Sequence, residues 1–210
     1  MALNLMKNRP QASHLIRKLS TNLLLDESPA EVFKKIVKDR RAVQRFKSDE
    51  IPRHLLNEII ESTLRTPSSF NLQPWTIILV SDPEVKAKVS KAMLDQNEPK
   101  VMSSPVLAVF LADLEPTKRL DRFLAKQKKF GATPQQLAKL SKLVSLFCGH
   151  GTVGNVLKRS ALSLVSPLKP VPSLSSIEAW SYKHAALAAQ TFMLAATSHG
   201  IGTAPMEGFD

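Results

Sequence analysis

A chain of 210 residues can form one domain with a sizeable core, and its 43% hydrophobic content is typical of a globular protein. No apolar run is long enough to cross a bilayer, so the sequence predicts no transmembrane segment. The single cysteine, Cys148, excludes an internal disulfide and fits a reducing compartment, and we expect it to be a buried apolar thiol.

The net charge of +11 is concentrated in two segments. Residues 1–25 carry four basic residues and no acid, and the segment from Lys118 to Lys142 carries eight basic residues against Asp121 alone. The second segment has few aromatic side chains for base stacking, so we interpret it as a solvated helix face and expect no nucleic-acid partner. The alternative, a nucleic-acid-binding protein, predicts salt-sensitive retention on nucleic acid.

The N-terminal stretch 1–25 has the composition of a mitochondrial transit peptide. Cations alternate with leucine and isoleucine, serines occur at Ser13 and Ser20, and the first acid is Asp26. We therefore expect a mitochondrial protein, or otherwise a cytoplasmic one. The alternative for this stretch is a disordered tail with incidental charge.

The first predicted helix begins after Ser28, with Pro29 at its first position, and ends near Asp39. Apolar residues at helical spacing predict a second helix from about Pro52 to Leu64. A strand is expected over residues 76–81, and Asp82 then caps a third helix that extends to about Met93.

The second half of the chain is predicted to be mainly helical. Residues 105–111 form an apolar run that indicates a buried central strand, and the basic region 115–148 has a helical pattern. The longest helix is expected over residues 176–198, with Gly200 as a left-handed C-cap. Residues 149–154 formally match the dinucleotide fingerprint, but no strand ending in an acid follows, so we expect no Rossmann site there.

Polar uncharged side chains are concentrated in Pro67-Ser68-Ser69-Phe70-Asn71-Leu72-Gln73-Pro74-Trp75. Hydroxyls and carboxamides both donate and accept hydrogen bonds, so this segment suits the edge of a polar planar ring. The prolines restrict the backbone and lower the ordering cost of binding. An ordinary helix-to-strand turn is the alternative.

Three segments together resemble the nitroreductase family of flavoenzymes. They are Arg40-Arg41-Ala42-Val43-Gln44-Arg45-Phe46, the polar segment just described, and Pro205-Met206-Glu207-Gly208-Phe209-Asp210. The resemblance implies an α+β fold with a mixed, mainly antiparallel sheet flanked by helices, normally a homodimer. It covers a nitroreductase-like domain over residues 28–210 and suggests that the family's C-terminal segment is lacking.

The resemblance further implies FMN as cofactor and NADH or NADPH as reductant. Nitroaromatic, quinone or similar conjugated molecules would be reduced in a second half-reaction. The alternative is a truncated, non-catalytic nitroreductase-like protein that acts as a binding or regulatory subunit. The five histidines show no paired spacing, so no metal site is expected.

The resemblance assigns no catalytic side chain, because flavin N5 carries the chemistry and the backbone of Glu207 and Gly208 would lie near it. Guanidinium groups suit the phosphate through their forked geometry. Relatives in the family usually have Ser at the position of Ala42 and a cation at that of Gln44. The residues assigned to FMN are Arg40, Arg41, Ala42, Gln44, Ser68, Ser69, Asn71, Gln73, Pro205, Met206, Glu207 and Gly208.

Overall fold

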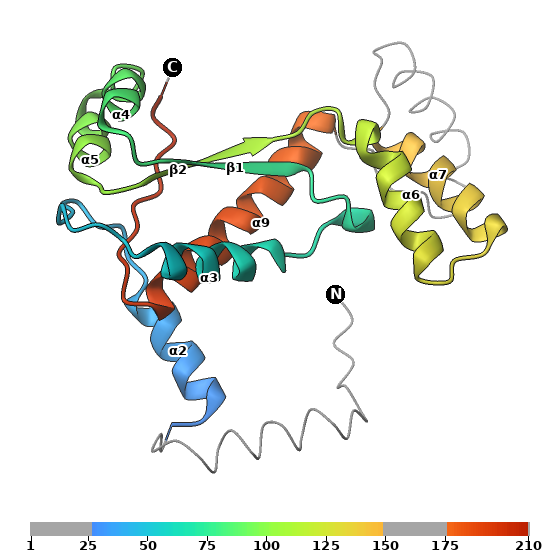
Figure 1. Cartoon of the computed structure of the whole chain (residues 1–210), viewed down its shortest axis with the longest axis horizontal. Helices are drawn as coiled ribbons and strands as arrows, with labels where there is room; N and C mark the ends of the chain where they lie inside the picture. Colours follow the sequence, from blue (N-terminus) through green and yellow to red (C-terminus); the bar gives the residue numbers. More distant parts are fainter. Residues whose placement is uncertain (1–26, 149–175, 210) are drawn as a thin grey trace, which may run out of the picture. The chain divides into compact units, whose positions relative to one another are not determined.

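The computed structural model describes residues 27–148 and 176–209 of the chain (Figure 1). The basic stretch 1–25 and the glycine-containing stretch 149–154 lie outside these residues. The chain divides into two compact units, residues 1–39 and residues 40–210. All three motif segments fall within the second unit.

The described part of the first unit is helix α2, Pro29–Asp39, which begins and ends where the sequence predicts. Its N-terminus is a capping box. The Ser28 backbone N–H donates to Glu31 Oε2 at 2.7 Å, and the Glu31 N–H donates to Ser28 Oγ at 3.3 Å. Hydrogen bonds from Ser28 lower the pKa of Glu31, because they stabilise its carboxylate form.

The second unit is a mixture of helices and a small sheet, so the predicted α+β class is confirmed. Its elements are α3 (Arg53–Leu64), η1 (Ser69–Asn71), β1 (Trp75–Val80), α4 (Pro83–Ser90), η2 (Asp95–Asn97), α5 (Glu98–Ser103), β2 (Leu107–Ala112), η3 (Pro116–Arg119), α6 (Leu120–Lys129), α7 (Pro134–Cys148) and α9 (Ile177–Ser198).

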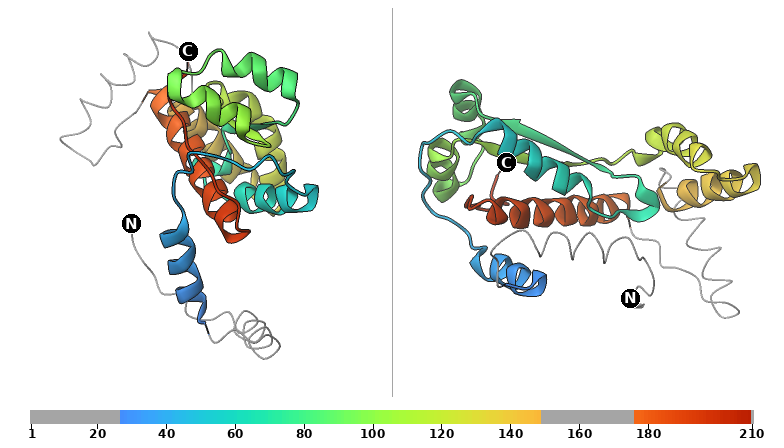
Figure 2. Two further views of the ribbon diagram at one scale, coloured as in Figure 1. Left: turned by 90° about the vertical axis from the view of Figure 1, so that its left-hand side faces the viewer. Right: turned by 60° about the horizontal axis from the view of Figure 1, so that its bottom comes forward.

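The sheet is an antiparallel pair in which Trp75 lies opposite Ala112 and Val80 lies opposite Leu107. Helix α9 packs on one face (Figure 2). Its Ala185 and Ala188 join Trp75 in a buried cluster. On the other face the side chain of Leu111 is 44% exposed. The predicted strand is present, but its central position was wrong, because among the described residues β2 pairs with β1 alone, and its side chains range from buried Leu107 to exposed Leu111.

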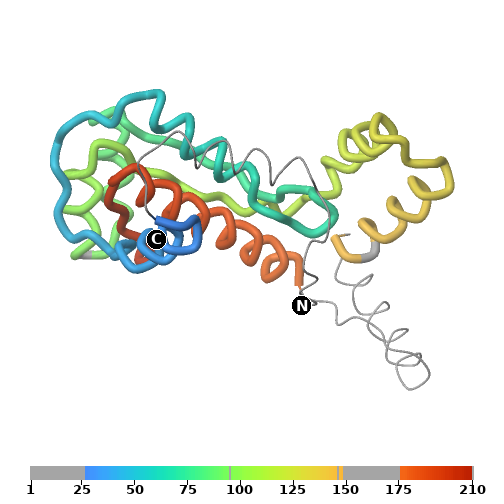
Figure 3. The backbone as a smooth tube through the Cα atoms, turned by 90° about the horizontal axis from the view of Figure 1, so that it is seen from below, coloured from blue at the N-terminus to red at the C-terminus, as the bar shows by residue number. Residues whose placement is uncertain are grey.

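Helix α9 organises the second unit. It runs beside α3 (Figure 3) and beneath the strand pair. Near its start, Trp180 lies in a second buried cluster, which joins the η1 turn to the α6–α7 hairpin; the other buried members are Leu72, Phe123, Val144 and Cys148. The predicted burial of Cys148 is confirmed.

The predicted caps explain where several helices begin and end. The Asp82 carboxylate accepts a hydrogen bond from the Val85 N–H at 2.9 Å, and Gly200 has a left-handed φ of 71°. Helix α4 ends at Ser90 rather than near Met93, because Met93 forms an antiparallel bridge with Phe209.

None of the helices within the described ranges combines the length and apolarity needed to cross a bilayer.

Candidate flavin site

The Arg40–Gln44 segment lies against the chain that leads into the C-terminal motif. Ala42 and Thr203 form an isolated parallel bridge, and the Val43 N–H donates to the Thr203 carbonyl oxygen at 2.9 Å. The approach requires glycine at position 202, since a Cβ there would lie 2.7 Å from Val43 Cγ2. The structure thus brings the first and third motifs together, although they are about 160 residues apart in the chain.

Arg40 and Arg41 are partly or fully exposed and carry uncompensated charge. Neither guanidinium has an acidic partner in the described parts of the chain. Two adjacent cations without carboxylates are free to bind an anion, and their forked geometry suits a phosphate.

The C-terminal motif is anchored by the segment between α4 and α5. The Gly208 carbonyl oxygen accepts hydrogen bonds from the Leu94 N–H at 3.0 Å and from Asn97 Nδ2 at 3.2 Å. A Cβ at position 208 would lie 2.9 Å from that Asn97 nitrogen, so glycine permits the contact. Among the described residues, the backbone N–H groups of Glu207 and Gly208 have no acceptor. Two fixed, unpaired donors of this kind suit an electron-rich ring atom.

The Ser68–Gln73 segment, called here the polar loop, has an unusual backbone. Three of its residues have a left-handed φ although none is glycine: Phe70 at 57°, Asn71 at 55° and Gln73 at 48°. This conformation costs an ordinary L-residue about 1 to 2 kcal/mol. Surrounding contacts must therefore hold the polar loop in place.

Those contacts come from several elements. Gln73 Nε2 donates to the Leu64 carbonyl oxygen at the end of α3 at 3.0 Å, and Arg119 Nη1 donates to the Gln73 carbonyl oxygen at 2.8 Å. Arg119 is itself oriented by an ion pair between its Nε and Asp113 Oδ2 at 2.8 Å. Within the loop, Ser68 Oγ accepts a hydrogen bond from the Gln73 N–H at 2.9 Å.

These contacts divide the predicted binding residues of the polar loop into those that hold the loop in place and one that is left unpaired. Ser68, Ser69 and Gln73 all use side-chain atoms to hold the loop itself. Asn71 is exposed, and its carboxamide has no partner among the described residues. Asn71 is therefore the loop side chain most available to a ligand.

His184 on α9 is a functional candidate that the sequence did not reveal. It is 2% exposed, and its Nε2 lies 3.0 Å from the Ser69 backbone nitrogen and 3.1 Å from Ser69 Oγ. Burial lowers the pKa of the imidazole below its ordinary value of 6.5, because desolvation disfavours the charged form. From the sequence, a histidine in an apolar helix is indistinguishable from an ordinary core residue. Its hydrogen-bond partner could not be inferred, because that partner is 115 residues away.

The polar loop and the other two motifs lie toward opposite ends of α9. Ser69 is bonded to His184 in the first half of the helix, whereas Thr203 follows its C-terminus. The helix extends about 20 Å from His184 to its last residue, at 1.5 Å per residue. Figure 1 shows η1 near the start of α9 and the terminal segment leaving its far end.

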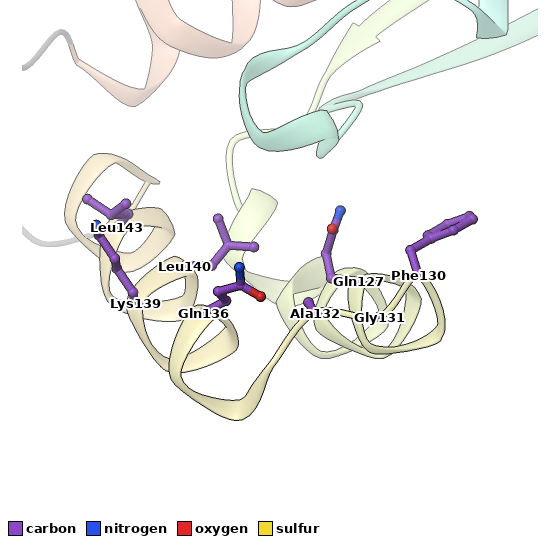
Figure 4. A pocket seen from close by; sticks show the side chains of 8 residues that line it. All are labelled: Gln127, Phe130, Gly131, Ala132, Gln136, Lys139, Leu140 and Leu143. Carbon is purple, nitrogen blue, oxygen red and sulfur yellow. The ribbon is translucent and has the colours of Figure 1, made fainter.

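The α6–α7 hairpin carries the basic segment and packs against the polar loop. The rings of Phe70 and Phe147 lie 5.9 Å apart, and Leu72 packs in the cluster around Trp180. The hairpin also holds an open cavity of about 460 Å³ near its turn (Figure 4). None of the predicted FMN residues lines that cavity; its lining is Gln127, Phe130, Gly131, Ala132, Gln136, Lys139, Leu140 and Leu143.

Comparison with known proteins gives a consistent result. The family model described as "Nitroreductase family" matches residues 37–210. The NADH dehydrogenase of Thermus thermophilus is 29% identical over 171 residues, which cover 81% of this chain and 71% of that protein. The 4-nitrobenzoate reductase of Pseudomonas putida is 28% identical over 178 residues, which cover 84% and 73% respectively.

A solved structure supports the fold. The FMN complex of a protein from Exiguobacterium sibiricum superposes with a TM-score of 0.60 at 23% identity. The superposition covers 85% of this chain and 75% of that one.

Proposed function

The chain belongs to the nitroreductase family, and from that premise we propose that it is an FMN-dependent oxidoreductase. Electrons would come from NADH or NADPH and pass to nitroaromatic, quinone or similar conjugated acceptors in two half-reactions. The observation that carries the proposal is the family match, which spans all three motifs. The relatives support its parts: one is named for NADH, another for a nitroaromatic acceptor, and a structural neighbour holds FMN.

The residues present fit FMN. Arg40 and Arg41 would hold the phosphate with charge-assisted hydrogen bonds. The unpaired N–H groups of Glu207 and Gly208 would donate to the ring near N5 and stabilise negative charge there. When bound, FMN would supply the hydride-accepting centre, and the chain supplies binding and orientation. The neutral Gln44 gives a weaker positive field than a cation would, which favours a lower flavin potential.

We propose that a second copy of the chain completes the site. In one copy the polar loop and the paired motifs are separated along α9, and they make no hydrogen bond to each other among the described residues. In a two-fold dimer the polar loop of one copy can meet Arg40, Arg41 and the Glu207–Gly208 backbone of the other. In that arrangement all three motifs would contact the same FMN molecule.

The basic segment of the α6–α7 hairpin would cover the site and attract anionic nicotinamide nucleotides. It is joined to the polar loop through the cluster around Trp180, so its position depends on that loop. Mitochondrial import directed by residues 1–25 stays a prediction.

The proposed function is tested by purifying the protein and recording its visible absorbance before and after adding FMN. We expect flavin bands that remain after gel filtration and that bleach under anaerobic conditions when NADH or NADPH is added. Subsequent addition of a nitroaromatic or a quinone should restore the oxidised spectrum. A colourless protein that takes up no FMN would exclude the proposal.

A further inference from the structure

The hydrogen bonds of His184 fix its protonation state. The Nδ1 atom lies 2.6 Å from the Trp180 carbonyl oxygen, which can only accept, so Nδ1 carries a proton. The Nε2 atom faces the Ser69 backbone N–H at 3.0 Å, which can only donate, so Nε2 must be unprotonated. Both partners independently require the same neutral tautomer.

This imidazole contacts the polar loop where it begins to deviate from ordinary backbone geometry. Ser69 immediately precedes Phe70 and Asn71, two of the residues with left-handed φ. The other outside bonds, from Leu64 and Arg119, reach the loop at Gln73, its far end. His184 is thus the hydrogen-bonding tether of the near end among the described residues.

We propose that His184 is a positioning residue for the flavin site: its neutral imidazole holds the polar loop in the conformation that presents Asn71, and a second proton on the ring releases that loop. That FMN is the ligand rests on the proposed function. The hydrogen bond between His184 and Ser69 does not depend on it. A doubly protonated ring would place an N–H against the Ser69 backbone N–H, so that bond would be lost, and the Ser69 hydroxyl, 3.1 Å from Nε2, would have to change from donor to acceptor.

The surroundings of His184 favour the neutral ring. Burial lowers the pKa of His184 most, the hydrogen bond to the Trp180 carbonyl raises it in part, and the cation of Lys183 on the same helix lowers it again. The facing η1 turn offers Ser69, and Trp180 offers a carbonyl and a ring 4.3 Å away. One turn earlier on α9, the Ser181 hydroxyl donates to the Asp113 carbonyl oxygen, and the Asp113 carboxylate is paired with Arg119. No carboxylate bonds to the imidazole in the described ranges to favour its protonation.

The first experiment needs no cofactor. Hydrogen-exchange protection of the Ser69 amide is measured in the apoprotein between pH 7.5 and pH 5, together with the ¹⁵N shifts of the imidazole. We expect a protected amide and a neutral ring at pH 7.5, with protection decreasing as the ring gains its second proton. An unprotected amide at pH 7.5, or protection that persists after protonation, would overturn the proposal.

The second experiment compares variants by FMN titration. His184→Gln retains a side-chain acceptor that does not titrate, and His184→Phe fills the space without one. At pH 7.5 we expect His184→Phe to raise the FMN dissociation constant about tenfold or more, from two lost hydrogen bonds, and His184→Gln to retain most of the affinity. The exposed His54→Gln is the matched control.

The pH dependence of FMN affinity distinguishes a positioning role of His184 from a purely structural one. The phosphate of FMN itself gains a proton at about pH 6, so His184→Gln provides the baseline. Wild-type protein should lose more affinity than His184→Gln between pH 7.5 and pH 5. Equal profiles would contradict the proposal. If no variant or wild type binds FMN while the Ser69 amide behaves as expected, the proposed function fails and the tether stands.

Discussion

Replacing Trp180 by alanine is expected to lower the free energy of unfolding by about 3 to 5 kcal/mol, the usual cost of deleting a large buried aromatic side chain. Trp180 is 5% exposed and lies at the point where α9, the polar loop and the α6–α7 hairpin meet. Its ring also lies 4.3 Å from the His184 ring. Urea denaturation measures the loss.

Tyr182→Ala is the matched control for this prediction. Tyr182 is an aromatic residue on the same helix, but its side chain is 58% exposed. Its replacement should change the free energy of unfolding by no more than about 0.5 kcal/mol. Similar losses in the two variants would show that the cluster around Trp180 is not a principal core of the second unit.

The double replacement Arg40→Gln and Arg41→Gln should weaken FMN binding by about 100-fold or more. Each charge-assisted hydrogen bond contributes about 1.5 to 3 kcal/mol, and about 1.4 kcal/mol corresponds to a factor of ten in affinity. The titration is run at constant ionic strength, because exposed charges are screened by salt.

Lys47→Gln with Arg53→Gln removes the same total charge from two exposed residues outside the motif. This control should bind FMN nearly as well as the wild type. If both double variants lose affinity equally, the arginines act only through net charge, and the phosphate-binding role of the Arg40–Arg41 pair is wrong.

The stability of the fold should also depend on pH through His184. The unfolded chain protonates this histidine near its ordinary pKa of 6.5, whereas burial lowers the pKa in the folded chain. The unfolded state therefore binds more protons between the two values, and stability falls as pH decreases through that window. Above pH 6.5 the contribution of the neutral ring is fully present. His184→Gln should remove this part of the pH dependence.

Local signals predicted most of the helices. The Ser28–Glu31 capping box, the Asp82 cap and the left-handed Gly200 are each determined by neighbouring residues, so their geometry can be inferred from short stretches. The three motifs could likewise be recognised from their order. The structure confirms that two of them meet, through the Ala42–Thr203 bridge.

Features that depend on distant contacts could not be predicted. Left-handed φ values at Phe70 and Gln73 have no glycine to signal them, because the strain is supported by His184, Arg119 and α3 rather than by the local sequence. The sequence placed Arg119 among the cations of a solvated helix face, whereas in the structure its guanidinium donates to the polar loop. The exposure of Leu111 in β2 also escaped prediction, since an apolar run does not say how completely both faces of a strand are covered.

The most direct test of a flavin site shared between two copies is complementation. One variant carries Arg40→Gln and Arg41→Gln, and the other carries Asn71→Asp, which tolerates the left-handed backbone but replaces the carboxamide by an anion. Each alone should bind little FMN. After unfolding and refolding together in equal amounts, random pairing should restore about one quarter of the sites, because each mixed dimer has one site with no altered residue. No recovery of FMN binding in the mixture would contradict the shared site.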